Sequence, residues 1–271
     1  TATYRHIRHV YFDADYKTSP ERLFDATTLD DLEFSDQITN IEVQQYGFEY
    51  ANLACDAQDV TNLLNLIFQS DKTSGYIPGR MAFFYTLFPD DFTELRLPAD
   101  NRLSDTIFDY VTMRGVTKVT FTGGNGLCQS YPFYNTSFPS LKTIVMESGT
   151  LAFSTSYGLP PLSAVEELII QDDCTINSMN FTGTLSKLKS IQIGNRVTIP
   201  KNGFSSMNAG ALETLTFGDN CVLKDNAFSS ATFGKLKAFT FKGTASDGNQ
   251  IFSSTKFPEL ETFEIAAGSY M

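Results

Sequence analysis

The sequence predicts a β-rich solenoid, in which short 24-residue coils stack so that their strands form a parallel sheet, behind an N-terminal α/β cap. Three observations support this prediction. An apolar hexad recurs about every 24 residues, an aromatic residue recurs with the same period, and the first third of the chain lacks the period. We expect residues 1–88 to form the cap or a small domain, and residues 89–271 to form about eight coils.

The hexad has apolar residues at its first, fourth and sixth positions. Successive hexads start 23 to 25 residues apart, and every one of these positions is apolar. Each hexad predicts a short strand whose apolar side chains face the interior of the coil. The hexads are Phe92/Leu95/Leu97, Val116/Val119/Phe121, Leu141/Ile144/Met146, Val165/Leu168/Ile170, Leu188/Ile191/Ile193, Leu212/Leu215/Phe217, Leu236/Phe239/Phe241 and Leu260/Phe263/Ile265.

An aromatic residue follows each of the first seven hexad starts by 16 or 17 residues. Phenylalanine has no polar atom that needs a partner, so we expect these side chains to stack as a ladder inside the coils. No coil can bury its own apolar face, so the stack is stable only as an array. The aromatic residues are Phe108, Phe133, Tyr157, Phe181, Phe204, Phe228 and Phe252.

The position after each hexad start alternates in charge along six coils. The residues are Lys142, Glu166, Lys189, Glu213, Lys237 and Glu261. If the coils are adjacent, each charge lies beside opposite charges. We interpret this pattern as a structural ladder that favours the correct register, since exposed ion pairs stabilise little.

The repeats resemble the BspA-like class of leucine-rich repeats. The resemblance covers roughly residues 90–271 and rests on segments such as those beginning at Leu188 and Leu212, in which a strand and a Gly/Asn turn lead to Gly-Phe-Ser-Ser or Ala-Phe-Ser-Ser. It implies a surface-displayed or secreted protein that takes part in adhesion. It does not name a partner, because such repeats are a scaffold for binding many molecules.

Residues 1–91 do not follow the period, although Ile38, Ile41 and Val43 fit one isolated hexad. The apolar spacing after Asp56 predicts a helix capped by Asp56 or Asp59, and Ser19-Pro20 predicts a second helix start. A cap would cover the open core of the first coil, and an independent domain with its own ligand is the alternative. After Ile265 the sequence ends before another aromatic would follow, which favours truncation of a longer protein over pairing at this end.

The net charge of −11 is concentrated at the N-terminus, because residues 1–91 contain 15 acidic and 6 basic residues. An acidic surface disfavours nucleic acid and anionic membranes as partners. No apolar run is long enough to predict membrane insertion. Together with the surface display that the resemblance implies, this favours an extracellular or host protein, or a glycan, as the partner.

Few residues suggest catalysis or a cofactor, and we predict neither an enzyme nor a metal site. His6 and His9 are the only histidines, and Asp13 and Asp15 lack the rest of a calcium loop. Cys174 and Cys221 occupy the same coil position as Val197, two coils apart, which predicts apolar fillers rather than a disulfide. Cys55 and Cys128 show no zinc spacing, and Asn135 and Asn180 begin glycosylation sequons.

The second and fourth positions after each hexad start should point outward from the strand and form the binding surface. They are mostly small and uncharged, which favours a protein or a glycan over nucleic acid as the partner. The predicted binding residues are Thr143, Val145, Ile169, Gln192, Thr214, Thr216, Thr240 and Thr262, with Glu167, Ser190, Ala238 and Glu264 in the same stripe. The alternative functions are a surface carbohydrate-binding protein that uses exposed aromatic residues such as Tyr46, Tyr50, Tyr76 or Tyr131, and a larger surface protein in which the solenoid is a spacer.

Overall fold

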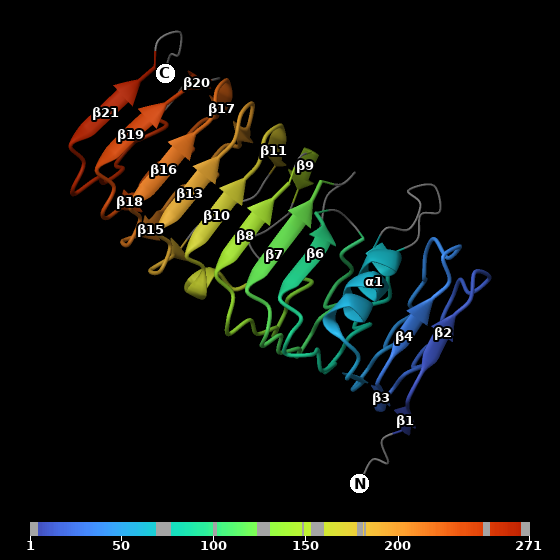
Figure 1. Ribbon diagram of the computed structural model, residues 1–271. Helices are drawn as coiled ribbons and strands as arrows, with labels where there is room; N and C mark the ends of the chain where they lie inside the picture. Colours follow the sequence, from blue (N-terminus) through green and yellow to red (C-terminus); the bar gives the residue numbers. More distant parts are fainter. Residues whose placement is uncertain are drawn as a thin grey trace. The chain divides into compact units, whose positions relative to one another are not determined.

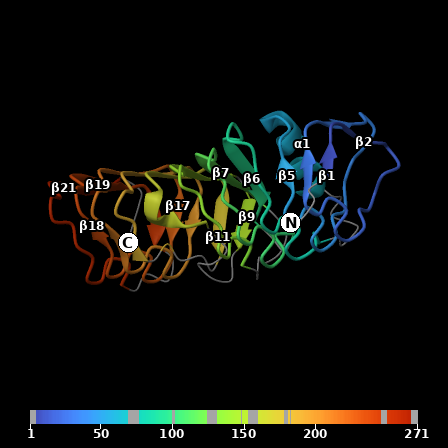
Figure 2. The ribbon, with the colours of Figure 1, turned by 90° about the horizontal axis from the view of Figure 1, so that it is seen from below.

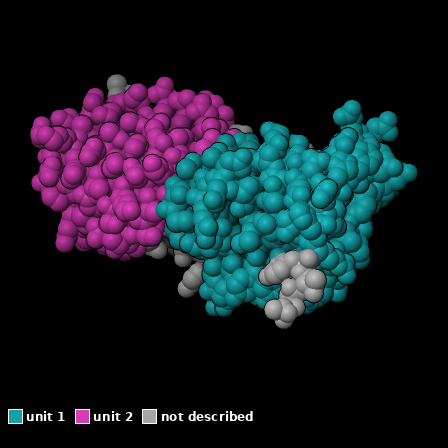
Figure 3. Space-filling view, turned by 60° about the horizontal axis from the view of Figure 1, so that its bottom comes forward, with its two compact units in different colours: residues 1–117, 128–140, 157–161 teal, residues 118–127, 141–156, 162–271 magenta. Residues whose placement is uncertain are grey.

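The computed structural model describes residues 5–68, 77–99, 102–123, 131–147, 149–152, 160–177, 181, 183–245 and 250–266. Two compact units divide the chain (Figure 3). Unit 1 comprises residues 1–117, 128–140 and 157–161, and unit 2 comprises residues 118–127, 141–156 and 162–271. Both units are built from parallel β coils, about nine in all and roughly 24 residues apart, so the predicted parallel β-solenoid is confirmed.

The coils of unit 1 begin at Arg5, well before the first regular hexad of the sequence. β1 pairs with β3 and β3 with β5, while β2 pairs with β4, and every pair is parallel. Isolated parallel bridges extend the same arrangement from Asn52 through Leu87 and Thr112 to Ser137. The strands are β1 (Arg5–Ile7), β2 (Val10–Phe12), β3 (Thr27–Leu29), β4 (Leu32–Phe34), β5 (Asn52–Leu53) and β6 (Glu94–Pro98).

The helix predicted after Asp56 is confirmed as α1 (Ala57–Phe68), shown in Figure 1. Its cap is Asp56, whose Oδ1 accepts a hydrogen bond of 3.0 Å from the backbone N–H of Asp59. The helix buries Val60, Leu63, Leu64, Ile67 and Phe68 on one face, as the apolar spacing requires.

The second predicted helix, beginning at Ser19-Pro20, is wrong. Residues 21–26 form turns instead, and Ser19 lies in a coil where its backbone N–H donates to the carbonyl of Glu42 at 2.8 Å. Arg22 and Ala26 have φ angles of 58° and 47°, in the left-handed region that a right-handed helix excludes. Pairing between coils thus outweighs the local helix signal.

Unit 2 has three sets of parallel strands, which Figure 1 shows as successive arrows. β17 and β11 lie on a different side of the coils from β19 and β7 (Figure 2). The hexad strands are β7 (Lys118–Thr122), β8 (Thr143–Met146), β10 (Glu167–Ile170), β13 (Ser190–Ile193), β16 (Thr214–Phe217), β19 (Ala238–Phe241) and β21 (Thr262–Ile265). The second set is β9 (Gly149–Ala152), β11 (Cys174–Asn177), β14 (Thr198–Ile199), β17 (Cys221–Leu223) and β20 (Gly243–Ala245). The third set is β12 (Gly183–Thr184), β15 (Met207–Ala209) and β18 (Thr232–Phe233). A short 3₁₀ helix, η2 (Leu162–Ala164), precedes β10.

An internal ladder of stacked phenylalanines runs through each unit, as the recurring aromatic predicts. In unit 2 the ring centroids of Phe181, Phe204, Phe228 and Phe252 follow at 5.0, 5.2 and 5.4 Å. In unit 1 the ladder includes Phe108 and Phe133 and extends to three residues outside the predicted series. Its order is Phe24, Phe48, Phe83, Phe108 and Phe133, with centroid distances of 5.0, 5.2, 5.4 and 5.9 Å. Tyr157 lies outside the described residues.

Candidate binding face on the hexad strands

The predicted stripe lies on the outward face of the hexad strands of unit 2. Strand pairing aligns its residues in two rows across β8, β10, β13 and β16. One row is Thr143, Glu167, Ser190 and Thr214, and the other is Val145, Ile169, Gln192 and Thr216. Between the rows, Ile144, Leu168, Ile191 and Leu215 point inward and are buried, so the strands alternate as predicted.

The exposed part of this face is centred on β13 and β16. Gln192, Thr214 and Thr216 are exposed, and Glu167 and Ile169 are half-buried. We call the outward residues Ile169, Gln192, Thr214 and Thr216 the recognition face. Together they present two threonine hydroxyls, one amide and one half-buried isoleucine, and no charged side chain.

One predicted binding residue is wrongly placed. Val145 is 5% exposed, and Thr120, its partner on β7, is 0% exposed. Strand alternation fixes which side of the sheet a residue occupies, but it does not determine whether that side is solvated. The outward row is therefore buried at the β7–β8 pair and open at β13 and β16.

The stripe continues on the parallel pair β19–β21, which forms a two-stranded sheet. Ala238 aligns with Thr262 and Thr240 with Glu264. Thr262 and Glu264 are exposed, and the Thr240 hydroxyl donates to Glu264 at 3.5 Å. Thr262 is thus an accessible member of the stripe, and Thr240 is half-buried.

Hydrogen bonds between coils order the side chains of the face. The amide of Gln192 donates to the Glu167 carboxylate at 2.7 Å. Beside the face, Lys189 binds Glu166 at 2.7 Å and Lys237 lies 3.6 Å from Glu261, as the charge alternation predicts. Glu213 instead lies 4.0 Å from Lys235, which is not in the predicted ladder.

The hydrogen bond from Lys189, together with its charge, lowers the pKa of Glu166. The Glu166 carboxylate therefore stays ionised at neutral pH and keeps its ion pair with Lys189. This pair holds neighbouring coils in register at the border of the recognition face.

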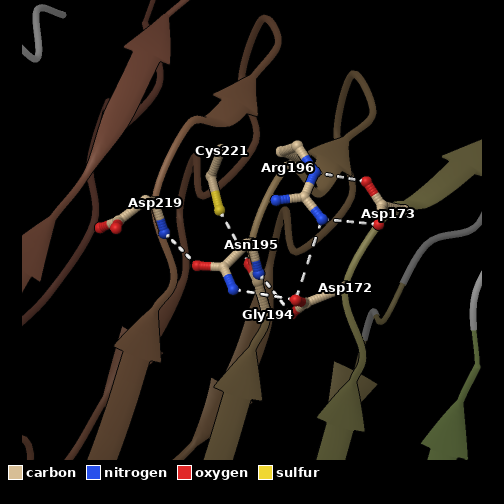
Figure 4. A network of polar contacts seen from close by, with 7 residues as sticks. All are labelled: Asp172, Asp173, Gly194, Asn195, Arg196, Asp219 and Cys221. Atoms are coloured by element: carbon tan, nitrogen blue, oxygen red, sulfur yellow. Dashed lines mark hydrogen bonds and ion pairs between the residues drawn. The ribbon is translucent and has the colours of Figure 1, made fainter.

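A second ordered network lies in the turns that follow β10, β13 and β16 (Figure 4). The Asn195 side chain donates to Asp172 at 2.9 Å and accepts from the backbone N–H of Asp219 at 2.8 Å, so it joins three successive turns. Arg196 makes a bidentate pair with Asp173, at 2.5 and 2.7 Å. The hydrogen bond from Asn195 lowers the pKa of Asp172, and that from Arg196 lowers the pKa of Asp173. These contacts fix the ends of the strands that carry the recognition face.

The cysteines of unit 2 fill the coil interior, as predicted. Cys174 and Cys221 are free and 0% exposed. Burial raises the pKa of Cys174 to about 12 and also raises that of Cys221. Their thiols are therefore protonated at neutral pH and are poor nucleophiles. Cys221 donates to the carbonyl of Gly194 at 3.1 Å, which ties the filler to the turn network.

The other sequence candidates do not converge on a site. His6 pairs with Asp30 at 2.7 Å, and His9 hydrogen-bonds to Asp31 on the exposed surface. The hydrogen bond to Asp31 raises the pKa of His9. Asp13 accepts from the backbone N–H of Ala14 at 2.6 Å. Within the described ranges no group of three His, Cys, Asp or Glu residues is arranged to hold a metal ion.

The remaining candidates are dispersed or lie outside the described residues. Cys55 is buried and free, and burial raises the pKa of its thiol to about 12. Asn135 is exposed in a turn, while Cys128, Asn180 and Tyr76 fall outside the described parts of the chain. A cavity of about 10 Å³ in unit 2, lined by Phe181, Leu185 and other apolar side chains, has room for no more than a water molecule.

Sequence reasoning missed an aromatic cluster on the surface of unit 1. Of the candidate tyrosines, Tyr50 is 43% and Tyr131 40% exposed, and Tyr46 is half-buried. Tyr50 stacks on Tyr85, and Tyr85 on Tyr110, at the position two residues after successive ladder phenylalanines. The repeated placement of a tyrosine two residues after a phenylalanine is present in the sequence. It becomes visible only when Phe48 and Phe83 are recognised as ladder residues.

The described segments of the chain contain one α-helix, and it is neither long nor apolar enough to cross a membrane. Comparisons of the chain with protein-family models, with curated proteins and with solved structures gave no significant match.

Proposed function

We propose that this chain is an extracytoplasmic, non-catalytic module that binds an extracellular or host protein through the recognition face and serves in adhesion. The observation that carries the proposal is the alignment of Gln192, Thr214 and Thr216 as exposed neighbours on ordered parallel strands. The resemblance to BspA-like repeats supports the same cellular setting. Repeat proteins commonly use such an extended strand face for recognition.

The chemistry of the face favours a protein over nucleic acid. The charged residues of the stripe itself, Glu167 and Glu264, are acidic, and lysines beside the hexad strands pair with Glu166, Glu213 and Glu261. Such a surface offers a phosphate backbone no cluster of unpaired basic side chains. Small hydroxyl and amide side chains can instead hydrogen-bond to a partner's polar groups while the buried row beneath them stays fixed.

The proposal is tested by screening the purified chain against extracellular-matrix and host-cell surface proteins by surface plasmon resonance. A double variant, Thr214→Lys with Thr216→Lys, places two large cations on the face. We expect a bound protein partner to lose at least about tenfold in affinity, since two mismatched charges at an interface cost more than 1.4 kcal/mol.

The matched control is Asn208→Lys, an exposed outward position on β15, in a different strand set of unit 2. It should leave binding unchanged. Circular dichroism and thermal unfolding must show that both variants are folded. Absence of any protein partner, or equal binding by the double variant, would contradict the proposal.

A further inference from the structure

We propose that the stacked tyrosines of unit 1 bind a linear neutral glycan, at a site separate from the recognition face. We call Tyr50, Tyr85 and Tyr110, with Phe84 beside them, the tyrosine ladder. The three tyrosines occupy one coil position, two residues after the ladder residues Phe48, Phe83 and Phe108.

The backbone holds the ladder in register. Tyr50 donates its N–H to the carbonyl of Phe84 at 2.8 Å, and Tyr85 donates to the carbonyl of Asp109 at 3.2 Å. All three tyrosines have φ between 53° and 58°, in the left-handed region. This conformation is unfavourable for a residue with a side chain and turns the three rings in the same direction.

The rings form a closed stack. The centroids of Tyr50 and Tyr85 are 5.1 Å apart with an interplanar angle of 8°, and those of Tyr85 and Tyr110 are 4.9 Å apart with an angle of 13°. Phe84 stands at 85° to Tyr85 with centroids 4.7 Å apart, and lies edge-on to Tyr50 and Tyr110 as well. Ring faces within the stack are therefore covered by neighbouring rings, and the ring edges remain for a ligand.

The tyrosines are nevertheless accessible, since 40–47% of each remains exposed. Their hydroxyls form no hydrogen bond with the described residues. A phenol hydroxyl both donates and accepts, so the ladder presents a periodic row of such groups about 5 Å apart, matching the ring spacing. Sugar hydroxyls have the same dual capacity, and a linear glycan repeats them at a spacing similar to that of the coils.

The charged residues next to the ladder in the sequence favour a neutral ligand. Glu49 and Asp109, next to Tyr50 and Tyr110, are 6% and 3% exposed. Arg22 is already engaged, because it pairs with Glu49 and its guanidinium lies 4.6 Å from the Tyr46 ring centroid. Anionic glycans would find acidic rather than free basic groups at this position.

Peptide ligands fit this geometry less well. A proline-rich peptide docks into slots between aromatic rings, and rings only about 5 Å apart leave no slot. A protein hot spot likewise needs an anchoring side chain or a pocket that receives one. The closed row of ring edges and hydroxyls provides neither, whereas a glycan can lie along it.

The alternative to a binding role is that the tyrosines only stabilise the coils. The corresponding positions in unit 2 hold Ser206, Ser230 and Ser254, with φ of 58° at each. Those coils keep their backbone bonds without an aromatic residue, because Ser206 donates to Ser229 at 2.8 Å and Ser230 to Ser253 at 2.7 Å. The coil architecture therefore does not require tyrosine at this position.

The test titrates the full chain with neutral cello-, chito- and manno-oligosaccharides, with heparin as the anionic probe and a proline-rich peptide as the peptide probe. The chain contains no tryptophan, so its intrinsic fluorescence reports tyrosine directly. We expect a neutral oligosaccharide to bind and to change this emission. We expect Tyr85→Ser, which installs the unit 2 residue, to weaken binding at least about tenfold through lost hydroxyl and ring contacts.

Two further variants make the outcome decisive. Tyr85→Phe keeps the ring and removes the hydroxyl, so it should also weaken binding and remains informative if Tyr85→Ser is unstable. Tyr11→Ser removes a tyrosine that is 52% exposed outside the ladder and should leave binding unchanged. The proposal is overturned if no neutral oligosaccharide binds, if heparin or the peptide binds instead, or if folded Tyr85→Ser and Tyr85→Phe bind like the wild type.

Discussion

Units 1 and 2 use the same turn for different surfaces. In both, the residue two positions after a ladder phenylalanine has a positive φ angle. The backbone N–H groups of Tyr50 and Tyr85 in unit 1, and of Ser206 and Ser230 in unit 2, donate to a carbonyl of the next coil. Unit 1 places Tyr50, Tyr85 and Tyr110 there in its middle coils, with Ala26 and Asn135 at the ends of its ladder, while unit 2 places Gly183 and then three serines. The comparison teaches that the backbone and the internal ladder define the coil, and that the outward side chain is free to serve a ligand.

The largest loss of stability is expected on changing the phenylalanine ladder, which both units share. Phe83→Ala in unit 1 and Phe228→Ala in unit 2 each remove a fully buried ladder ring, so each should lower the free energy of unfolding by about 3–5 kcal/mol. Urea unfolding followed by circular dichroism measures both. Leu87→Ala, at a residue 57% exposed, is the control and should change stability by less than about 0.5 kcal/mol. A small effect in only one unit would show that the ladders are not equivalent.

A glycine substitution at the shared turn separates conformational strain from stacking. Ser230→Gly and Tyr85→Gly relieve the same left-handed conformation, but only the second removes stacked rings. Tyr85→Gly should therefore be less stable, relative to wild type, than Ser230→Gly by about 1–3 kcal/mol, from two stacking contacts of about 0.5–1.5 kcal/mol each. The same urea experiment provides the comparison. Equal effects would mean that the tyrosine stack contributes no stability, which would sharpen the case for a purely binding role.

The smallest change in stability is expected at the residue directly before the left-handed residue of the shared turn. Unit 1 has the buried Asp109 at this position, and unit 2 has serines. Burial raises the pKa of Asp109 above its ordinary value of 3.8, although hydrogen bonds from Asn135 and from the Tyr110 backbone oppose the shift. The folded state then binds the proton more tightly than the unfolded state. The stability from this group is present below the unfolded pKa and is lost as the pH rises through the folded pKa.

Asp109→Asn should consequently raise the free energy of unfolding at pH 7 relative to wild type and flatten its decline between pH 4 and 7. The amide oxygen can still accept from Asn135, so the local geometry is kept. Ser229→Asn in unit 2 is the control and should leave the pH dependence unchanged. An unchanged pH profile in Asp109→Asn would show that this carboxyl group is not the origin of the dependence.

The sequence predicted the hexad strands and most of the phenylalanine ladder, because both depend on a period that local chemistry does not disturb. The coils of unit 1 were not recognised from a 24-residue period because α1 lengthens one of them. Phe48 and Phe83 lie 35 residues apart in sequence, whereas Phe83 and Phe108 lie 25 apart. The ring centroids of Phe48 and Phe83 are nevertheless 5.2 Å apart, so the two residues occupy the same position in neighbouring coils. The insertion changes their spacing in the sequence but not their stacking in the structure.

The candidate sites were predictable to different extents. Strand alternation correctly placed Gln192, Thr214 and Thr216 outward, but it could not reveal that Val145 is buried on the same side of the sheet. The tyrosine ladder could not be assembled until the coils of unit 1 were known, because Tyr50 and Tyr85 are 35 residues apart. Periodic patterns identify which residues occupy the same position in successive coils. The solvent exposure of those residues depends on the packing around them.

The most direct test of the account is one binding matrix, measured by biolayer interferometry. Its rows are wild type, the recognition-face variant Thr214→Lys with Thr216→Lys, and the ladder variant Tyr85→Ser. Its columns are the protein partner from the screen and the best neutral oligosaccharide. The account predicts that the recognition-face variant loses only the protein, and that the ladder variant loses only the glycan. Loss of both ligands in one folded variant, or of neither in both, would contradict two separate surfaces on one coil architecture.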